Sequence, residues 1–87
     1  MDAYETVSAL FLMERLLRED NFSEVDEVLK AYEVDRLQPA TLLGVLTLTW
    51  HAKGQLSARE DFLARSEASM TTRLGSDRTQ ALLKLRR

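Results

Sequence analysis

Residues 39–63, PATLLGVLTLTWHAKGQLSAREDFL, contain the clearest signals for the fold of this 87-residue chain. Pro39 suits the first turn of a helix, because its missing N–H would have no partner there and its φ is already helical. Gly54 stands where a left-handed helix C-cap is usual. Ser57 and Glu60 have the spacing of a capping box. These signals predict one helix that begins at Pro39, a turn at Gly54 and a second helix that begins near Ser57.

Apolar residues recur at helical spacing through the rest of the chain, and its few Pro and Gly residues mark breaks between helices. Gly75 is the last of these stop signals. We therefore expect a single all-α domain over residues 1–87. The expected arrangement is an α-hairpin stack or small helix bundle with two antiparallel helical hairpins and a C-terminal capping helix: hairpin 1 over about 3–36, hairpin 2 over about 39–74 and the C-terminal helix over about 77–86.

The first hairpin is acidic and carries an apolar face on each of its helices. The expected inner face of the first helix consists of Val7, Leu10, Phe11, Leu16 and Leu17, and Leu12 and Met13 are expected to widen it toward burial on two sides. Ser23 is the expected N-cap of the second helix, which should end by Leu37. The acidic residues after that cap suit the positive end of the helix dipole: Glu24, Asp26 and Glu27. We interpret them as solvated residues of a helix start, not as acid–base or metal-binding carboxylates.

The residues that usually carry chemistry are sparse. The absence of cysteine excludes a disulfide framework, thiolate metal sites and a cysteine nucleophile. The one histidine, His51, has no second histidine at ligand spacing, and no Asp-rich loop or phosphate-binding glycine motif occurs. We therefore expect no enzyme activity, no catalytic residues, no metal site and no cofactor.

No part of the sequence suggests a membrane protein. The most apolar stretch, residues 42–50, is less than half the ~20 residues that a transmembrane helix needs. The first residues lack the basic and apolar regions of a secretory signal. We therefore expect a cytoplasmic protein with no membrane partner.

The two hairpins align with each other at an offset of 34 residues. At this offset apolar, cap and turn positions coincide, as in the pairs Leu12 and Leu46, Leu16 and Trp50, Asp20 and Gly54, Ser23 and Ser57, and Leu29 and Leu63. In this pattern the chain resembles the tetratricopeptide family, whose repeat is a helix-turn-helix of 34 residues. It departs from the family at Arg59, where a small alanine is expected.

The resemblance implies a binding surface for an extended or helical peptide of a partner protein. In stacked hairpins of that family, the first helix of each hairpin lines a concave surface. Carried over by position, the surface includes Gly44 and Ala52. The expected partner-binding residues on it are Val7, Leu10, Glu14, Leu17, Arg18, Thr41, Leu48 and His51.

The charge is divided unequally along the chain. Residues 1–43 carry a formal charge of −6 and residues 44–87 one of +4. We expect a small non-catalytic protein–protein interaction or adaptor module, which binds a partner polypeptide or a second copy of itself as a homodimer. The alternative is a helix-turn-helix-type nucleic-acid-binding or regulatory protein that uses the basic C-terminal half. In that case Arg59, Arg65 and Arg73 would face phosphates, although Glu60, Asp61 and Glu67 lie among them.

Overall fold

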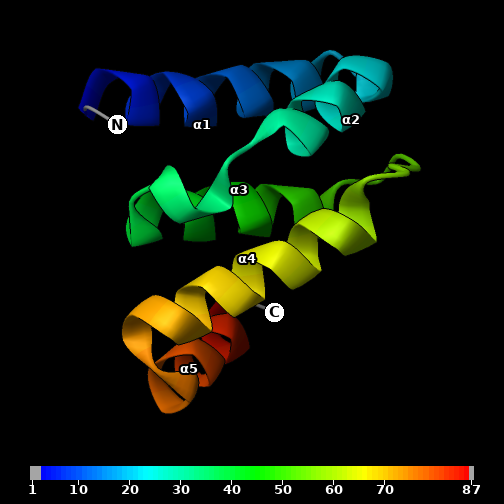
Figure 1. The fold of residues 1–87 in the computed structure, drawn as a ribbon. Coiled ribbons are helices and arrows are strands. Elements are labelled where there is room, and N and C mark those ends of the chain that lie inside the picture. The colour runs from blue at the N-terminus through cyan, green and yellow to red at the C-terminus, as the bar shows by residue number, and fades with distance from the viewer. Residues whose placement is uncertain (1–2, 87) are drawn as a thin grey trace.

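The computed structural model describes the backbone of residues 3–86 and the side chains of residues 10–85. The described residues form an all-α fold, as predicted, and contain no β-strand (Figure 1). The elements in chain order are α1 (Ala3–Arg18), α2 (Phe22–Ala31), the 3-10 helix η1 (Val34–Arg36), α3 (Pro39–His51), α4 (Arg59–Leu74) and α5 (Ser76–Arg86).

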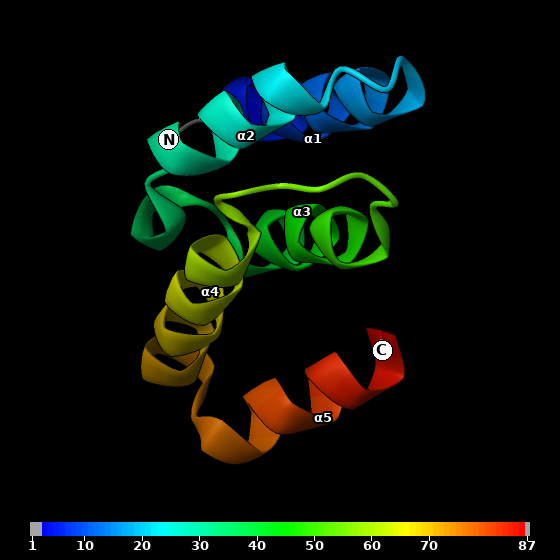
Figure 2. The same cartoon turned by 90° about the vertical axis from the view of Figure 1, so that its right-hand side faces the viewer.

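The turn between α1 and α2 is a Schellman motif. Asp20 has a left-handed φ of 56°, and the Asn21 N–H donates to the Leu16 carbonyl at 2.9 Å. Asn21 is also the N-cap of α2, because its side chain accepts the Glu24 N–H at 3.5 Å. The prediction of Ser23 as the cap was wrong, since α2 begins at Phe22 and Ser23 lies inside its first turn. This turn sends α2 back alongside α1 (Figures 1 and 2).

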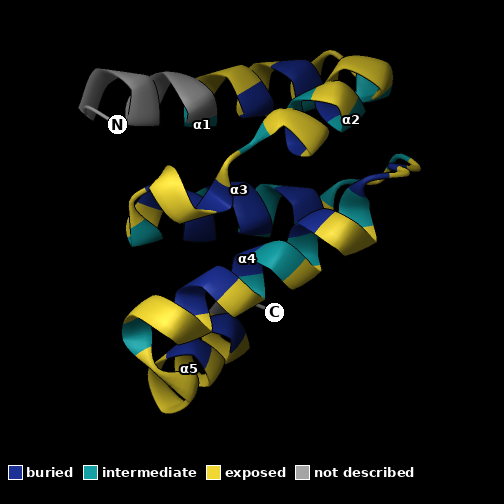
Figure 3. Cartoon of the chain, viewed as in Figure 1, coloured by how far each residue is buried: buried dark blue, intermediate teal, exposed yellow. Residues whose placement is uncertain are grey.

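α3 is the central helix of the structure. It begins at Pro39, as predicted, and packs against α1 on one side and α4 on the other (Figure 1). A helix that is apolar around most of its surface is stable when neighbours cover it, and α3 contains buried residues on several faces (Figure 3). Thr49 is fully buried, and its hydroxyl donates to the Val45 carbonyl at 2.8 Å, which satisfies that polar group inside the core.

Gly54 does not have the left-handed conformation that its position suggested. Among the glycines of the chain, the positive φ belongs to Gly75, at 89°, where α4 ends. The C-cap of α3 is Ala52, in extended conformation. A Cβ atom on Gly54 would collide with the ring of Phe22. Gly54 is therefore required for the close approach of the α3–α4 loop to the start of α2.

The predicted capping box of α4 was also wrong. α4 begins at Arg59, and its N-cap, Ala58, makes no side-chain cap bond. A carboxylate from α2 takes that role, because Asp26 accepts the Ala58 N–H at 2.7 Å and the Ser57 hydroxyl. The sequence pattern predicts Asp26 only as a solvated residue at the start of its own helix. The structure differs, because α4 packs against α2 and brings Ser57 and Ala58 to the Asp26 carboxylate. The hydrogen bonds from Ser57 and Ala58 lower the pKa of the Asp26 carboxyl below its ordinary value of 3.8.

Two arginines of α4 satisfy main-chain carbonyls at the ends of earlier helices. Arg65 donates to the Leu29 and Tyr32 carbonyls, both at 3.0 Å, at the end of α2. Arg73 donates to the Leu37 carbonyl at 2.5 Å and the Val34 carbonyl at 3.1 Å, at η1. Helix ends leave carbonyls short of intrahelical partners, so these bonds help to complete α2 and η1. The Val34 carbonyl also accepts the Leu37 N–H at 3.3 Å.

A third arginine does the same for the preceding helix. The Arg59 guanidinium donates to the Trp50 carbonyl in the last turn of α3 at 2.6 Å. We call Arg59, Arg65 and Arg73 the α4 arginines. Together they join α4 to the ends of the three helical segments that precede it.

The inner face of α1 differs from the prediction at Phe11 and at Leu12, which is 39% exposed. Met13 and Leu16 are buried against α2 and α3, whereas Phe11 is 65% exposed. The prediction of Phe11 as a core residue was wrong, because the helical turn places it opposite Met13. The side chain of Val7 lies outside the described residues.

α5 turns away from α4 after Gly75 and packs against α4 through Thr79 and Leu83 (Figure 2). Most of its other residues are exposed (Figure 3), and Leu85 is 82% exposed. Among the described side chains of α5, residues 76–85, only Thr79 and Leu83 are buried.

We expect the charge of Asp26 to make stability depend on pH. Its pKa is lower in the folded chain than in the unfolded chain, so its contribution is present above about pH 4 and disappears as the pH falls through the folded-state value. Asp26→Asn should show a smaller loss of unfolding free energy in acid than the parent chain, measured by urea denaturation at several pH values. Asp77→Asn, which changes a carboxylate of α5, is the control. Its unfolding free energy should fall with decreasing pH as steeply as that of the parent chain.

We expect Arg73→Met to lower the free energy of unfolding by roughly 1–2 kcal/mol, because it keeps the apolar stem and removes the side-chain donor to the Val34 and Leu37 carbonyls. Arg78→Met is the matched control, since Arg78 is exposed and makes no hydrogen bond within the described residues. Chemical denaturation of both variants measures the difference. Equal stability of the two variants would show that the Arg73 bonds contribute nothing.

Candidate functional site

A groove of about 400 Å³ lies between the C-terminal halves of α1 and α3. We call it the α1–α3 groove. Five of the eight predicted partner-binding residues line it: Glu14, Leu17, Arg18, Leu48 and His51. Ala52, which the resemblance also placed on this surface, lines the groove as well. The other four lining residues were not predicted for binding: Asp20, Phe22, Thr47 and Lys53. Both helices contribute because α1 packs directly against α3.

The other three predicted residues lie elsewhere. Thr41 is buried, with 9% exposure, and does not line the groove. It lies in the first turn of α3, so a partner in the groove does not reach it. Leu10 is half-buried and packs over Gly44, 3.2 Å from the position that a Cβ atom would occupy there. Gly44 thus permits close packing of α1 on α3. The side chain of Val7 is not among those described.

The groove has an apolar floor and a charged rim. Leu17, Phe22 and Leu48 are half-buried, so each presents part of its apolar surface to the groove. On the rim, Glu14 and Arg18 form an exposed ion pair at 2.8 Å. Apolar centres surrounded by polar rims are the usual anatomy of protein-binding surfaces.

Three of the four lining residues that sequence reasoning missed lie at helix ends. Asp20 belongs to the Schellman turn, Phe22 begins α2 and Lys53 follows the end of α3, whereas Thr47 lies within α3. Asp20 and Lys53 have opposite charges and make no ion pair within the described part of the chain. The predicted residues were carried over from the tetratricopeptide resemblance onto the first helix of each hairpin, so residues of the connecting turns gave no signal.

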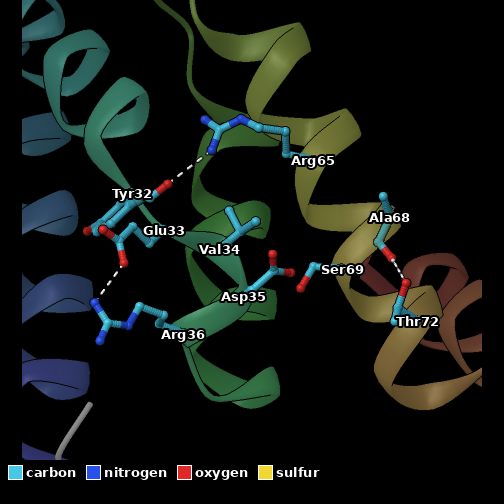
Figure 4. A pocket seen from close by; sticks show the side chains of 9 residues that line it. All are labelled: Tyr32, Glu33, Val34, Asp35, Arg36, Arg65, Ala68, Ser69 and Thr72. Carbon is cyan, nitrogen blue, oxygen red and sulfur yellow. Dashed lines mark hydrogen bonds and ion pairs between the residues drawn. The ribbon is translucent and has the colours of Figure 1, made fainter.

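A second cavity, of about 670 Å³, lies between η1 and α4 (Figure 4). We call it the η1–α4 pocket. The residues that line it are Tyr32, Glu33, Val34, Asp35, Arg36, Arg65, Ala68, Ser69 and Thr72. Burial raises the pKa of the Tyr32 hydroxyl to about 12, so this group stays protonated at neutral pH. The sequence analysis placed no site here, because the pocket depends on where α4 crosses η1.

A third cavity, of about 470 Å³, lies between the start of α3 and α5. Its walls are almost entirely apolar: Pro39, Ala40, Leu43, Leu74, Ala81 and Leu82, with Arg78 at the edge. The cavity forms because α5, which packs mainly on α4, turns back on the side of α3 (Figure 2).

The described residues show no constellation for metal chemistry. Within residues 10–85, no group of three or more His, Asp or Glu side chains is placed to hold a metal ion. None of the described helices is long and apolar enough to cross a membrane. A scan against protein-family models gave no match, and searches of curated proteins and of solved structures found no similar chain.

The α4 arginines bear on the nucleic-acid alternative. Their guanidinium groups all bind main-chain carbonyls of the same chain. An arginine that is held in this way is less available to a phosphate. The remaining basic residues of the C-terminal half are Lys53, which lines the α1–α3 groove, those of α5, where Arg78 and Lys84 are exposed, and the C-terminal Arg87.

We expect Gly54→Ala and Gly44→Ala to have opposite effects. The added methyl at Gly54 meets a ring that is packed beside the groove, so the free energy of unfolding should fall by roughly 1–3 kcal/mol. At Gly44 the nearest atom is the end of a flexible leucine, and alanine favours helix by up to about 1 kcal/mol. Thermal unfolding followed by circular dichroism compares the two. A Gly54→Ala chain as stable as the parent would show that Phe22 moves freely.

Proposed function

We propose that this protein is a small non-catalytic interaction module that binds a partner polypeptide in the α1–α3 groove. The proposal is carried by one observation, namely that five residues selected from the sequence for partner binding line a single groove. The floor of that groove is apolar and its rim is charged. Such a surface gains binding energy from apolar burial, while its rim selects the orientation of the partner.

The lining residues define the chemistry of the partner. Leu17, Phe22 and Leu48 favour apolar side chains on one face of the bound segment. Asp20 and Lys53 offer one charge of each sign that has no partner among residues 10–85, so the segment should carry a basic and an acidic residue beside its apolar face. An amphipathic helix or extended peptide has these features.

The packing of the helices is compatible with the resemblance to tetratricopeptide hairpins. α1 packs against α3, and α2 packs against α4, which are the contacts that two successive hairpins make in a stack. In that arrangement α1 and α3 are the first helices of their hairpins. The groove between them is then the counterpart of the peptide-binding surface that the resemblance implies.

A selection from a display library of random peptides tests the proposal. Peptides selected on the parent chain should be amphipathic, and their affinity, measured by fluorescence anisotropy, should fall at least tenfold with Leu17→Glu or Leu48→Glu, because a carboxylate on the apolar floor opposes apolar burial. Leu85→Glu makes the same change at an exposed leucine of α5 and is the matched control. Circular dichroism confirms that each variant remains helical.

Lys53→Glu provides a second measurement that does not disturb the floor. Lys53 is exposed, so the variant should fold like the parent and bind acidic peptides several-fold more weakly. Peptides that bind all of these variants equally would place the binding site elsewhere. Binding of a second copy, seen as a dimer by analytical ultracentrifugation and abolished by Leu48→Glu, would identify this chain itself as the partner.

A further inference from the structure

The η1–α4 pocket contains a buried polar group without a partner. Ser69 is 4% exposed, and its hydroxyl makes no hydrogen bond within the described residues. Buried hydroxyl groups in native proteins nearly always have a hydrogen-bond partner. Ser69 lines the pocket, so its hydroxyl is placed to bond a group that enters from outside (Figure 4).

A carboxylate faces the same space. Figure 4 shows Asp35 of η1 on the side of the pocket opposite α4, with its carboxylate and the Ser69 hydroxyl directed into the space between them. Asp35 is exposed and makes no hydrogen bond or ion pair within the described residues. The pocket therefore combines an unpaired negative charge at its mouth with an unbonded hydroxyl on its buried wall.

The other charges of the pocket are already engaged. Arg36 binds the Glu33 carboxylate at 2.9 Å. Arg65 binds the Asp61 carboxylate at 2.9 Å and donates to the Tyr32 carbonyl at 3.0 Å (Figure 4). Asp35 is thus the one charge of the pocket lining that lacks a counterion among the described residues, and it favours a cationic ligand.

The two open groups together indicate which cation fits. A carboxylate accepts two parallel hydrogen bonds, and a serine hydroxyl accepts a further one. A guanidinium presents five N–H donors in a planar fork, whereas an ammonium is a compact charge that cannot make the paired bonds. We propose that the η1–α4 pocket binds an arginine guanidinium, with Asp35 as the bidentate acceptor and Ser69 Oγ as an additional acceptor.

The size of the pocket agrees with this ligand. Its volume of about 670 Å³ lies within the range of roughly 300–1,000 Å³ that is typical of small-molecule sites. It therefore admits a whole arginine residue with part of its neighbours. The arginine comes either from a polypeptide or from the free amino acid, and the two sources differ in the charges on their main-chain groups. The site shares no lining residue with the α1–α3 groove.

Nuclear magnetic resonance titration of the full chain tests this site. The probe is Nα-acetyl-arginine amide, which represents an arginine inside a polypeptide, and the ¹H–¹⁵N spectrum reports the amides of residues 34–36 and 68–72. We expect saturable shifts there, with an affinity at least tenfold higher than for Nα-acetyl-citrulline amide, the neutral isostere, and higher than for Nα-acetyl-lysine amide. Free arginine forms a separate arm: comparable binding identifies the amino acid as a ligand, and weaker binding identifies a polypeptide arginine.

Three variants assign the binding to the named groups. Asp35→Asn should weaken the arginine probe at least tenfold, and Ser69→Ala should weaken it about threefold while the spectrum stays folded. Asp77→Asn makes the same change as Asp35→Asn outside the pocket and should bind as the parent does. The proposal is overturned if citrulline binds as well as arginine, if Asp35→Asn binds unchanged, or if the shifts arise outside the pocket. Failure here would leave the peptide-binding test of the α1–α3 groove unaffected.

Discussion

The structure depends on hydrogen bonds that α4 exchanges with the ends of the helices before it. Asp26 of α2 caps the start of α4, and Arg65 of α4 completes the end of α2. Arg73 donates to a carbonyl at the end of η1, and Arg59 donates to a carbonyl in the last turn of α3. Hydrogen bonds to a charged donor or acceptor are stronger than neutral ones. Here they satisfy main-chain N–H and carbonyl groups at helix ends, which apolar packing cannot do. They fix where α4 crosses the other helices, and the η1–α4 pocket results from that crossing.

The same bonds change the meaning of the charge asymmetry. The acidic half of the chain includes α1 and α2, and three of the eight basic residues of the other half bind carbonyls inside the molecule. Of the remaining five, three lie in α5 and one is the C-terminal residue: Arg78, Lys84, Arg86 and Arg87. α1 and α2 lie at the opposite end of the molecule from α5 (Figure 1). The chain therefore has an acidic end and a basic end, with its central helix between them.

The sequence predicted the local features of the fold well and its long-range features poorly. Pro39, Gly75 and the apolar periodicity located the helices, because these signals act within one or two turns. Gly54 and Ser57 were assigned to local caps, but their roles come from Phe22 and Asp26, which are about thirty residues away in the chain. For the groove, the resemblance to tetratricopeptide hairpins located five of the lining residues of α1 and α3, whereas the burial of Thr41 depends on the neighbouring helices, which the sequence does not place.

The position of these caps in the chain also determines how it can fold. The bonds between α4 and the α2–η1 region join residues that are 31 to 39 positions apart. A growing chain that ends before α4 lacks the donors that complete α2 and η1. We therefore expect α2 and η1 to gain their full stability only when α4 is in place. Folding should then be cooperative from α2 to α4, unlike linear repeat arrays in which each unit adds to its neighbour independently.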